Sequence, residues 1–265
     1  MELSGKRVLL TGATGGLGQA IGGALARRGV TLVLSARKPE ALRELAESLP
    51  GEHEIAPADL AEEGAAERLA ADAGEIDCLV ANAGLPGTGR VESFSPQEVT
   101  RALRVNLEAP IILARELAPG MSERGNGHLV FVSSLAGKAP SPRSSVYCGT
   151  KFGLRGFALS LRADLARTGV GVSLVLPGFI REAGMFAASG AKPPPGLGTS
   201  TPEEVAAAVV KAIERDKMEV TVAPLRQRAL AHLGLASPRV AMRAITGGTA
   251  RKTADRVAEG QASKR

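Results

Sequence analysis

The chain has 265 residues, of which 44% are hydrophobic, 23% charged and only 3% aromatic, so it can bury a large core made mainly of aliphatic side chains. No stretch approaches the roughly 20 apolar residues of a membrane span, and the start "MELSGKRVLL" lacks the features of a signal peptide. Cys78 and Cys148 are too few for a disulfide scaffold and, like the three histidines, have no metal-ligand spacing, so we expect a cytoplasmic protein without a metal site.

The net charge of +6 is concentrated at one end of the chain. From Pro224 onward there are nine Lys and Arg residues and two acidic ones, which leaves 24 basic and 25 acidic residues before it. The main body is therefore nearly neutral and only the last segment is basic. Nucleic-acid binding by the whole protein is not expected from this distribution.

In chain order, short apolar runs alternate with longer amphipathic segments. The runs predict strands at 7–12, 31–36, 53–58, 76–84, 127–134, 171–178 and 218–224, and the segments predict helices at 16–29, 39–49, 62–74, 95–121, 144–169 and 201–216. Repeated β-α alternation predicts an α/β Rossmann-type doubly wound parallel sheet of about seven strands with helices on both faces. We expect one domain over 1–224 and a basic, partly helical extension over 225–265.

The first predicted strand runs directly into "TGATGGLGQAIG" (11–22) and then into a helix. Glycines at such a turn let the backbone approach a pyrophosphate, whose charge is favoured by the free N–H groups at the helix start. A glycine cluster alone is a weak signal, but its place between the first strand and the first helix makes it informative. We therefore predict a dinucleotide cofactor.

The end of the second predicted strand bears on which dinucleotide is bound. An NAD site usually has an acid there, for the ribose 2′-hydroxyl, whereas an arginine suits a 2′-phosphate. This chain has Ala36 and Arg37, with Ser35 before them and Lys38 after. The sequence therefore favours NADP(H) over NAD(H).

Seven short motifs follow one another along the chain: "TGATGGLG" (11–18), "ADL" (58–60), "NAG" (82–84), "VNLEAP" (105–110), "VSSLAG" (132–137), "YCGTK" (147–151) and "LPGFI" (176–180). Through these motifs the chain resembles, over about residues 5–224, the short-chain dehydrogenase/reductase family in its shorter single-domain reductase subtype. The resemblance implies catalytic roles for four residues: Ser134, Tyr147, Lys151 and Asn106. It also implies that the cofactor contacts Gly12, Thr14, Gly15, Gly16, Leu17, Gly18, Arg37, Asp59, Leu60, Asn82, Ala83, Gly84, Tyr147, Lys151, Pro177, Gly178 and Ile180.

Tyr147, the only tyrosine, stands four residues before Lys151 in a predicted helix, so both side chains share one face. We expect the lysine ammonium to lower the pKa of the phenol from about 10 and to prepare it for general acid–base catalysis. The resemblance implies that Ser134 holds the substrate carbonyl oxygen and that Lys151 also binds the nicotinamide ribose. It further implies that Asn106 positions a water that relays protons to the lysine.

The chain departs from the family pattern after "PGFI", where a threonine that often contacts the nicotinamide is absent and Arg181 and Glu182 stand instead. Whether Glu182 replaces that contact is left open. We expect the following segment, 181–200, to be a substrate lid, and its Met185 and Phe186 suggest a partly apolar substrate. The pocket should also include residues near 85–95 and 135–146.

The second departure is the extension. It lacks the family's C-terminal segment that packs in tetramers, so we expect a homodimer and do not assume a tetramer. Residues 225–246 carry apolar side chains among arginines: Leu225, Ala229, Leu230, Leu233, Val240, Met242 and Ile245. These fit either a basic amphipathic element that meets a membrane surface or, as we favour, a helical pair docked on the domain or on a second subunit.

We predict an NAD(P)-dependent oxidoreductase, most simply an NADPH-dependent reductase of a ketone or aldehyde acting on a small molecule, or the reverse alcohol oxidation. A catalytically silent nucleotide-sensing protein of the same fold is the alternative. A sugar-nucleotide epimerase is disfavoured, because only 87 residues follow residue 178, too few for a sugar-binding domain. The sequence does not identify the substrate.

Overall fold

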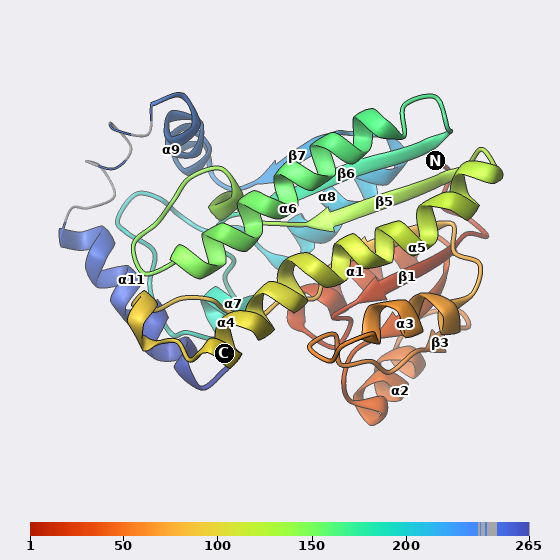
Figure 1. The fold of residues 1–265 in the computed structure, drawn as a ribbon, viewed down its shortest axis with the longest axis horizontal. Coiled ribbons are helices and arrows are strands. Elements are labelled where there is room, and N and C mark those ends of the chain that lie inside the picture. Colours follow the sequence, from red (N-terminus) through yellow and green to blue (C-terminus); the bar gives the residue numbers. More distant parts are fainter. Residues whose placement is uncertain (238, 240–241, 243–247, 265) are drawn as a thin grey trace.

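The computed structural model describes residues 1–237, 239, 242 and 248–264. Its centre is a seven-stranded parallel sheet in the order β3-β2-β1-β4-β5-β6-β7 (Figure 1). The order reverses beside β1, as in doubly wound folds, so the crevice at the carboxyl ends of β1 and β4 is the expected ligand site. The strands are β1 Arg7–Thr11, β2 Thr31–Ser35, β3 Glu54–Ile55, β4 Cys78–Ala81, β5 Gly127–Val132, β6 Val170–Pro177 and β7 Glu219–Val222.

Helices cover both faces of this sheet, and each face has its own hydrophobic layer. Leu and Val side chains of the strands pack with α1, α2 and α8 on one face and with α3, α5 and α6 on the other. This explains why most strands are apolar throughout rather than alternating. The helices are α1 Gly16–Ala26, α2 Pro39–Ser48, α3 Ala65–Ala73, α4 Pro96–Leu103, α5 Ala109–Glu123, α6 Ser145–Asp164, α7 Gly184–Ala187, α8 Pro202–Glu214, α9 Leu225–Ala236 and α11 Gly248–Gln261.

The predicted fold class is confirmed, and two predicted elements differ in detail. The third strand, expected over 53–58, is reduced to Glu54–Ile55 at the edge of the sheet. The backbone N–H groups of Ala56 and Ala58 still bond to the carbonyl oxygens of Leu34 and Ala36, so the chain follows β2 for a few residues beyond the strand. The helix expected over 95–121 is α4 and α5 joined by a π-helical segment, Arg104–Glu108. A single π-helical turn of this kind, which is wider than an α-helical turn, is frequent at functional sites.

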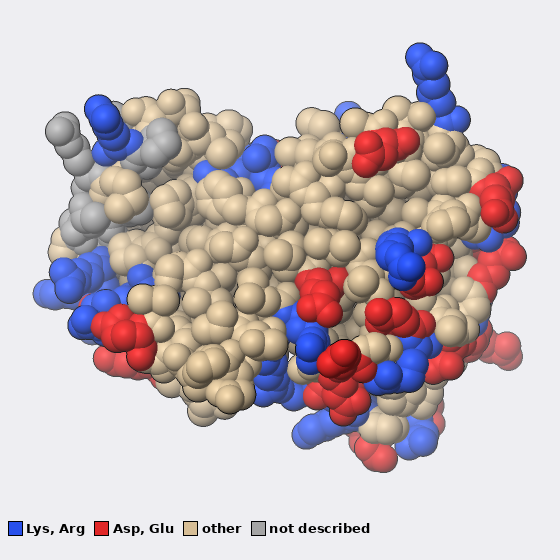
Figure 2. Space-filling view, in the orientation of Figure 1, with Lys and Arg blue, Asp and Glu red and all other residues tan. Residues whose placement is uncertain are grey.

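The extension forms α9, α11 and a final short 3-10 turn, Ala262–Lys264. In Figure 1, α11 (dark blue) lies beside α4 and α7, far from the β1–β3 end of the sheet. Two of the predicted apolar positions, Val240 and Ile245, lie outside the described residues. On the face seen in Figure 2, charges of both signs gather over the region of α2 and α3, and basic side chains stand beside α11. Among the described helices, none has the length and apolar character that crossing a bilayer requires.

Candidate active site

A cleft of about 1160 Å³ opens at the carboxyl ends of β1, β4, β5 and β6. Every residue predicted to bind the cofactor lines it, and so do Ser134, Tyr147 and Lys151. These residues come from turns spread between Gly12 and Ile180, so the topology brings them together. The fourth predicted catalytic residue, Asn106, lies behind the wall of the cleft and is 1% exposed.

The glycine turn after β1 has no room for side chains. Gly12 has a φ of +64°, and a Cβ there would lie 2.8 Å from the Cα of Ala83. A Cβ on Gly18 would overlap the carbonyl oxygen of Gly12 and lie 2.7 Å from that of Ala13. Gly15, the residue before α1, makes no side-chain cap, so the first N–H groups of the helix remain available to an anion. This cradle fits a pyrophosphate.

Side chains from two strand ends hold the glycine turn in place. The hydroxyl of Thr11 accepts hydrogen bonds from the backbone N–H groups of Asn82 and Ala83, both at 3.1 Å. The Asn82 amide in turn donates to the carbonyl oxygens of Thr11 and Gly12, at 3.1 and 3.2 Å. The ends of β1 and β4 are therefore locked together before any ligand binds.

At the other end of the cradle, Arg37 is exposed and lines the cleft beside Lys38. In the described part of the chain, no hydrogen bond ties the Arg37 guanidinium to another residue. Asp59 keeps one carboxylate oxygen on the backbone N–H of Ala61, at 3.0 Å, and Leu60 is buried beside it. An arginine without a hydrogen-bond partner among the described residues, at a strand end that has no carboxylate, is compatible with the binding of a phosphate group of the cofactor.

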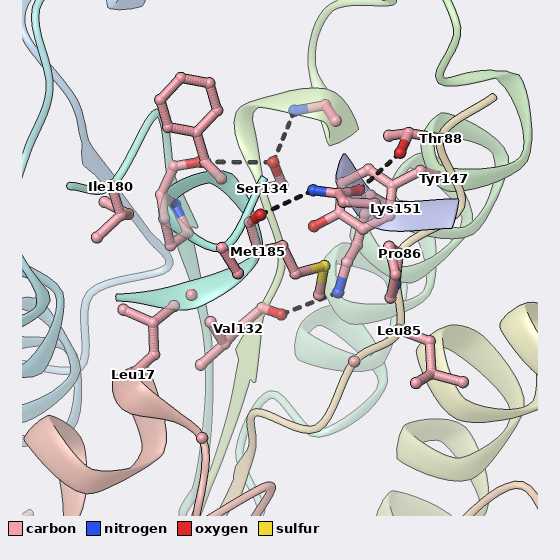
Figure 3. Close-up of a pocket in the computed structure, with 18 of the residues that line it drawn as sticks. Leu17, Leu85, Pro86, Thr88, Val132, Ser134, Tyr147, Lys151, Ile180 and Met185 are labelled. Atoms are coloured by element: carbon pink, nitrogen blue, oxygen red, sulfur yellow. Dashed lines mark hydrogen bonds between the residues drawn. The ribbon is translucent and has the colours of Figure 1, made fainter. Parts of the chain in front are cut away.

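Tyr147, Lys151 and Ser134 meet where β5 and α6 border the cleft (Figure 3). The Lys151 Nζ lies 5.7 Å from the centre of the Tyr147 ring and donates to the carbonyl oxygen of Val132 at 3.2 Å. The Ser134 hydroxyl accepts from the N–H of Ala136 at 3.1 Å and donates to the Pro177 carbonyl oxygen at 3.5 Å. These bonds fix the rotamers of both polar groups beside the phenol.

The predicted lowering of the Tyr147 pKa is wrong for this structure. Burial raises the pKa of Tyr147 to about 12, and a hydrogen bond from Ser134 opposes the shift only in part. Burial also lowers the pKa of Lys151 to about 8, because its side chain is 3% exposed. Desolvation is thus the largest cause of both shifts. At neutral pH the phenol keeps its proton and can act as an acid.

Asn106 lies in the π-helical segment and uses its amide to hold the loop after β4. Its Oδ1 accepts from the N–H of Leu85 at 2.7 Å, and its Nδ2 donates to the carbonyl oxygen of Leu85 at 2.9 Å. A weaker contact of 3.5 Å reaches the Thr150 hydroxyl on α6. The water-positioning role implied by the family resemblance stays a prediction.

The segment 181–200 begins and ends at a bridge between Ile180 and Ser200, so its two ends lie side by side. Within it, Met185 and Phe186 line the cleft, and the ring of Phe186 lies 4.6 Å from that of Phe179. A Cβ added to Gly16 would lie 2.5 Å from the Cβ of Ala183, so the segment covers the glycine turn directly.

Glu182, one of the two residues that stand where the family often has a threonine, lies outside the wall of the cleft. Its carboxylate pairs with Arg181 at 2.9 Å, and the Arg181 guanidinium also reaches Thr199. Neither Arg181 nor Glu182 lines the cleft. Glu182 has a φ of +69°, a strained conformation for a non-glycine residue, which turns the chain into the lid.

The cleft also includes residues that belong to none of the motifs. Gly87 lies against the start of α6, where a Cβ would be 2.9 Å from the Tyr147 nitrogen, and its carbonyl oxygen accepts from that nitrogen at 3.1 Å. Thr88 follows it in the cleft wall, and Gln261 of α11 lines the same cleft. Gly87 and Thr88 fall within the range 85–95 where pocket residues were expected, whereas Gln261 lies far along the chain from every motif and was missed. Within the described residues, no cluster of His, Cys, Asp and Glu could hold a metal.

Comparison with known proteins places the chain in a family. Residues 6–193 match the family "short chain dehydrogenase". The chain is 38% identical over 227 residues to the ketoacyl reductase HetN of Nostoc sp., covering 83% of this chain and 79% of that one. It is 33% identical over 182 residues to a 3-oxoacyl-[acyl-carrier-protein] reductase FabG of Rickettsia prowazekii, covering 69% and 76%.

Solved structures agree with the sequence matches. A metagenomic short-chain oxidoreductase, solved in complex with NADP, superposes with a TM-score of 0.70 and is 33% identical, covering 84% of this chain and 98% of that one. The match in sequence extends over most of the domain, and the cleft holds the family's motifs in one place. The chain therefore belongs to the short-chain dehydrogenase/reductase family and is an oxidoreductase that uses NAD(P).

Proposed function

We propose that the protein is an NADPH-dependent reductase that converts a hydrophobic ketone or aldehyde to an alcohol. The observation that carries the proposal is the meeting of Tyr147, Ser134 and Lys151 at one wall of a cleft whose other end is the glycine turn. A retired, purely nucleotide-sensing site would have no need of all three side chains.

In the proposed reaction the Tyr147 hydroxyl donates a proton to the substrate oxygen, while the Ser134 hydroxyl hydrogen-bonds that oxygen and orients the carbonyl. The cofactor, when bound, supplies a hydride to the carbonyl carbon. A pKa of about 12 means that Tyr147 starts protonated at neutral pH, as reduction requires. The Lys151 ammonium, 5.7 Å from the ring centre, then stabilises the negative charge left on the phenol oxygen.

The preference for NADPH rests on the surface around Arg37. Its exposed guanidinium lines the cleft after β2, where Ser35, Ala36 and Arg37 leave no carboxylate to bind a ribose 2′-hydroxyl. Arginine can bind a phosphate with two parallel hydrogen bonds. Replacing Arg37 by alanine should lower kcat/KM for NADPH about tenfold and leave that for NADH within about twofold. Equal losses with both cofactors would contradict the preference.

The substrate class is proposed from the walls of the cleft and from the relatives. Apolar side chains line its outer part, among them Leu135, Pro140, Met185, Phe186 and Leu230. The two relatives named above are a ketoacyl reductase and a 3-oxoacyl-[acyl-carrier-protein] reductase. We propose a ketone on an apolar chain, for which a 3-oxoacyl thioester is a suitable test compound. The predicted homodimer and cytoplasmic location stay predictions.

The test is NADPH oxidation against a panel of ketones, aldehydes and 3-oxoacyl thioesters, with Tyr147→Phe measured beside the wild type. Removing the phenol hydroxyl should lower kcat by about 10²- to 10⁴-fold, with NADPH binding, followed by fluorescence, nearly unchanged. Equal turnover by both proteins would overturn the assignment of Tyr147. Tight NADPH binding without turnover of any compound would favour the sensing alternative.

A further inference from the structure

The last helix of the chain is tied to two loops of the cleft by one side chain. Gln261 is 3% exposed. Its Oε1 accepts a hydrogen bond from the Thr88 hydroxyl at 2.6 Å, and its Nε2 donates one to the carbonyl oxygen of Met185 at 2.8 Å. Both bonds are drawn in Figure 3. Thr88 is 173 residues away in the chain and Met185 is 76.

Two further contacts fix α11 against the same region. Asp255 pairs with Arg143 at 2.6 Å, so α11 also holds the loop before α6. A Cβ on Gly260 would lie 2.8 Å from the Cα of Ser189, which shows how closely α11 meets the lid. The helix therefore contacts all three segments that were expected to form the substrate pocket.

The face of α11 toward the cleft is uncharged. Thr253, Ala254, Val257 and Gln261 line the same cavity as Tyr147 and Lys151. Lys264, in the 3-10 turn that follows the helix, also lines the cavity and is charged. The uncharged face of α11 itself suits an uncharged, partly apolar part of a ligand.

We propose that Gln261 is a positioning residue for the substrate: it holds α11, the Thr88 loop and the Met185 segment together around the distal, apolar part of the carbonyl compound. α11 is thereby the wall that gives the enzyme its preference for long chains. This inference rests on the proposed carbonyl reduction, since it concerns the same cleft.

The physical reason is that a glutamine offers one acceptor and one donor on a single planar group. Thr88 is buried and needs an acceptor, while the Met185 carbonyl needs a donor, and the two loops do not bond to each other directly through these atoms. Without Gln261 both polar groups lose their partner, and a substrate must then order the loops at its own cost. The loss should appear in KM rather than in kcat.

The experiment compares Gln261→Met, which keeps the length of the side chain but no hydrogen bond, with Gln97→Met on the exposed face of α4 as the matched control. Substrates are 2-butanone and 2-decanone with saturating NADPH. For Gln261→Met we expect KM for 2-decanone to rise about tenfold or more, because both buried hydrogen bonds of the side chain are lost. KM for 2-butanone should change less than about threefold and kcat less than about twofold, with no change in Gln97→Met.

Further variants separate the two bonds. Thr88→Val should raise KM for 2-decanone and Thr88→Ser should restore it. In the double variant Thr88→Val/Gln261→Met the two effects should not add, because both remove the same bond. A uniform fall in kcat for both ketones, or no change in KM, would overturn the inference.

A readout without turnover keeps this test separate from that of the proposed function. Gln261→Met should speed amide hydrogen exchange about tenfold in residues 85–95 and 184–190, whereas Gln97→Met should not. If the wild type reduces no ketone, the proposed function fails and the exchange rates still decide whether Gln261 holds the loops. Unchanged exchange would overturn the positioning role.

Discussion

The two sides of the cleft are built in different ways. The cofactor side, formed by the glycine turn after β1 and residues 82–84 after β4, is made of closely packed backbone, where a Cβ on Gly12 or Gly18 would overlap backbone atoms. The substrate side, formed by 85–95, 135–146, 181–200 and α11, is made of side chains that bridge distant parts of the chain. The first depends on glycines that are recognisable in the local sequence and on bonds between two neighbouring strand ends, and the second on side-chain ties between distant segments.

This difference predicts how each side responds to mutation. On the cofactor side a single added methyl group meets backbone atoms, which cannot move aside without deforming the sheet edge. On the substrate side the loss of a side chain removes a tie between two segments and leaves the rest in place. Binding of the dinucleotide and choice of substrate should therefore be separable by mutation.

The largest expected effect is on the substrate side, at a buried ion pair below the Ser134 loop. Lys138, whose side chain is 3% exposed, pairs with Glu219 of β7, which also binds Arg155 at 2.8 Å. These partners lower the pKa of Glu219 although burial alone would raise it. Glu219→Ala leaves a buried ammonium unpaired and should lower the free energy of unfolding by about 3–5 kcal/mol, measured by urea denaturation.

The exposed Glu203→Ala on α8 is the control for this prediction and should change the free energy of unfolding by less than about 0.5 kcal/mol. The folded fraction of Glu219→Ala should still bind NADPH with its normal affinity. A large loss of that affinity would break the separation between the two sides.

The second expected effect is on the cofactor side. Gly18→Ala places a methyl group against the carbonyl oxygens of Gly12 and Ala13 and should cost about 1–3 kcal/mol of stability. The NADPH dissociation constant, measured by fluorescence titration, should rise by a factor of ten or more. The relative rates with different ketones should not change. Gly156→Ala in α6, where the methyl group meets nothing within 4 Å, should instead stabilise the protein slightly.

The smallest effect is expected at Lys151, where the two sides meet. Burial lowers its pKa from 10.5 to about 8, so between these values the unfolded chain holds a proton that the folded chain has lost. The free energy of unfolding therefore rises with pH across this window. Lys151→Met lacks this titration. The melting temperature of the wild type, followed by calorimetry from pH 8 to 10, should gain a few degrees relative to the variant, and parallel curves would contradict the shift.

The sequence predicted which residues gather at the glycine end of the cleft because the signals there are local. The turn 11–18 needs glycines for steric reasons that are visible in the order of residues, and the Tyr147–Lys151 spacing follows from helix geometry alone. All the predicted cofactor-contacting residues line one cleft. The prediction that failed concerned the pKa of Tyr147. This pKa depends on how much protein surrounds the phenol, which a spacing of four residues does not reveal.

The substrate side could be predicted only in outline. The lid at 181–200 was expected from its place after the sixth strand and from Met185 and Phe186, which do line the cleft. The basic composition of the extension drew attention to its charge, whereas most of its contacts with the cleft are made by uncharged residues such as Val257 and Gln261. No local pattern marks a glutamine whose partners are 76 and 173 residues away.

The π-helical segment between α4 and α5 has a consequence for insertions and deletions in this protein. Each residue of an α-helix turns the chain by about 100°. The extra residue of the π-helical turn therefore lets the buried side of α4 face a different direction from the buried side of α5. Deleting one residue from 104–108 would restore a regular helix but rotate either the Asn106 amide away from Leu85 or the apolar stripe of α5 away from the sheet. The irregular turn and the asparagine can therefore be gained or lost only together.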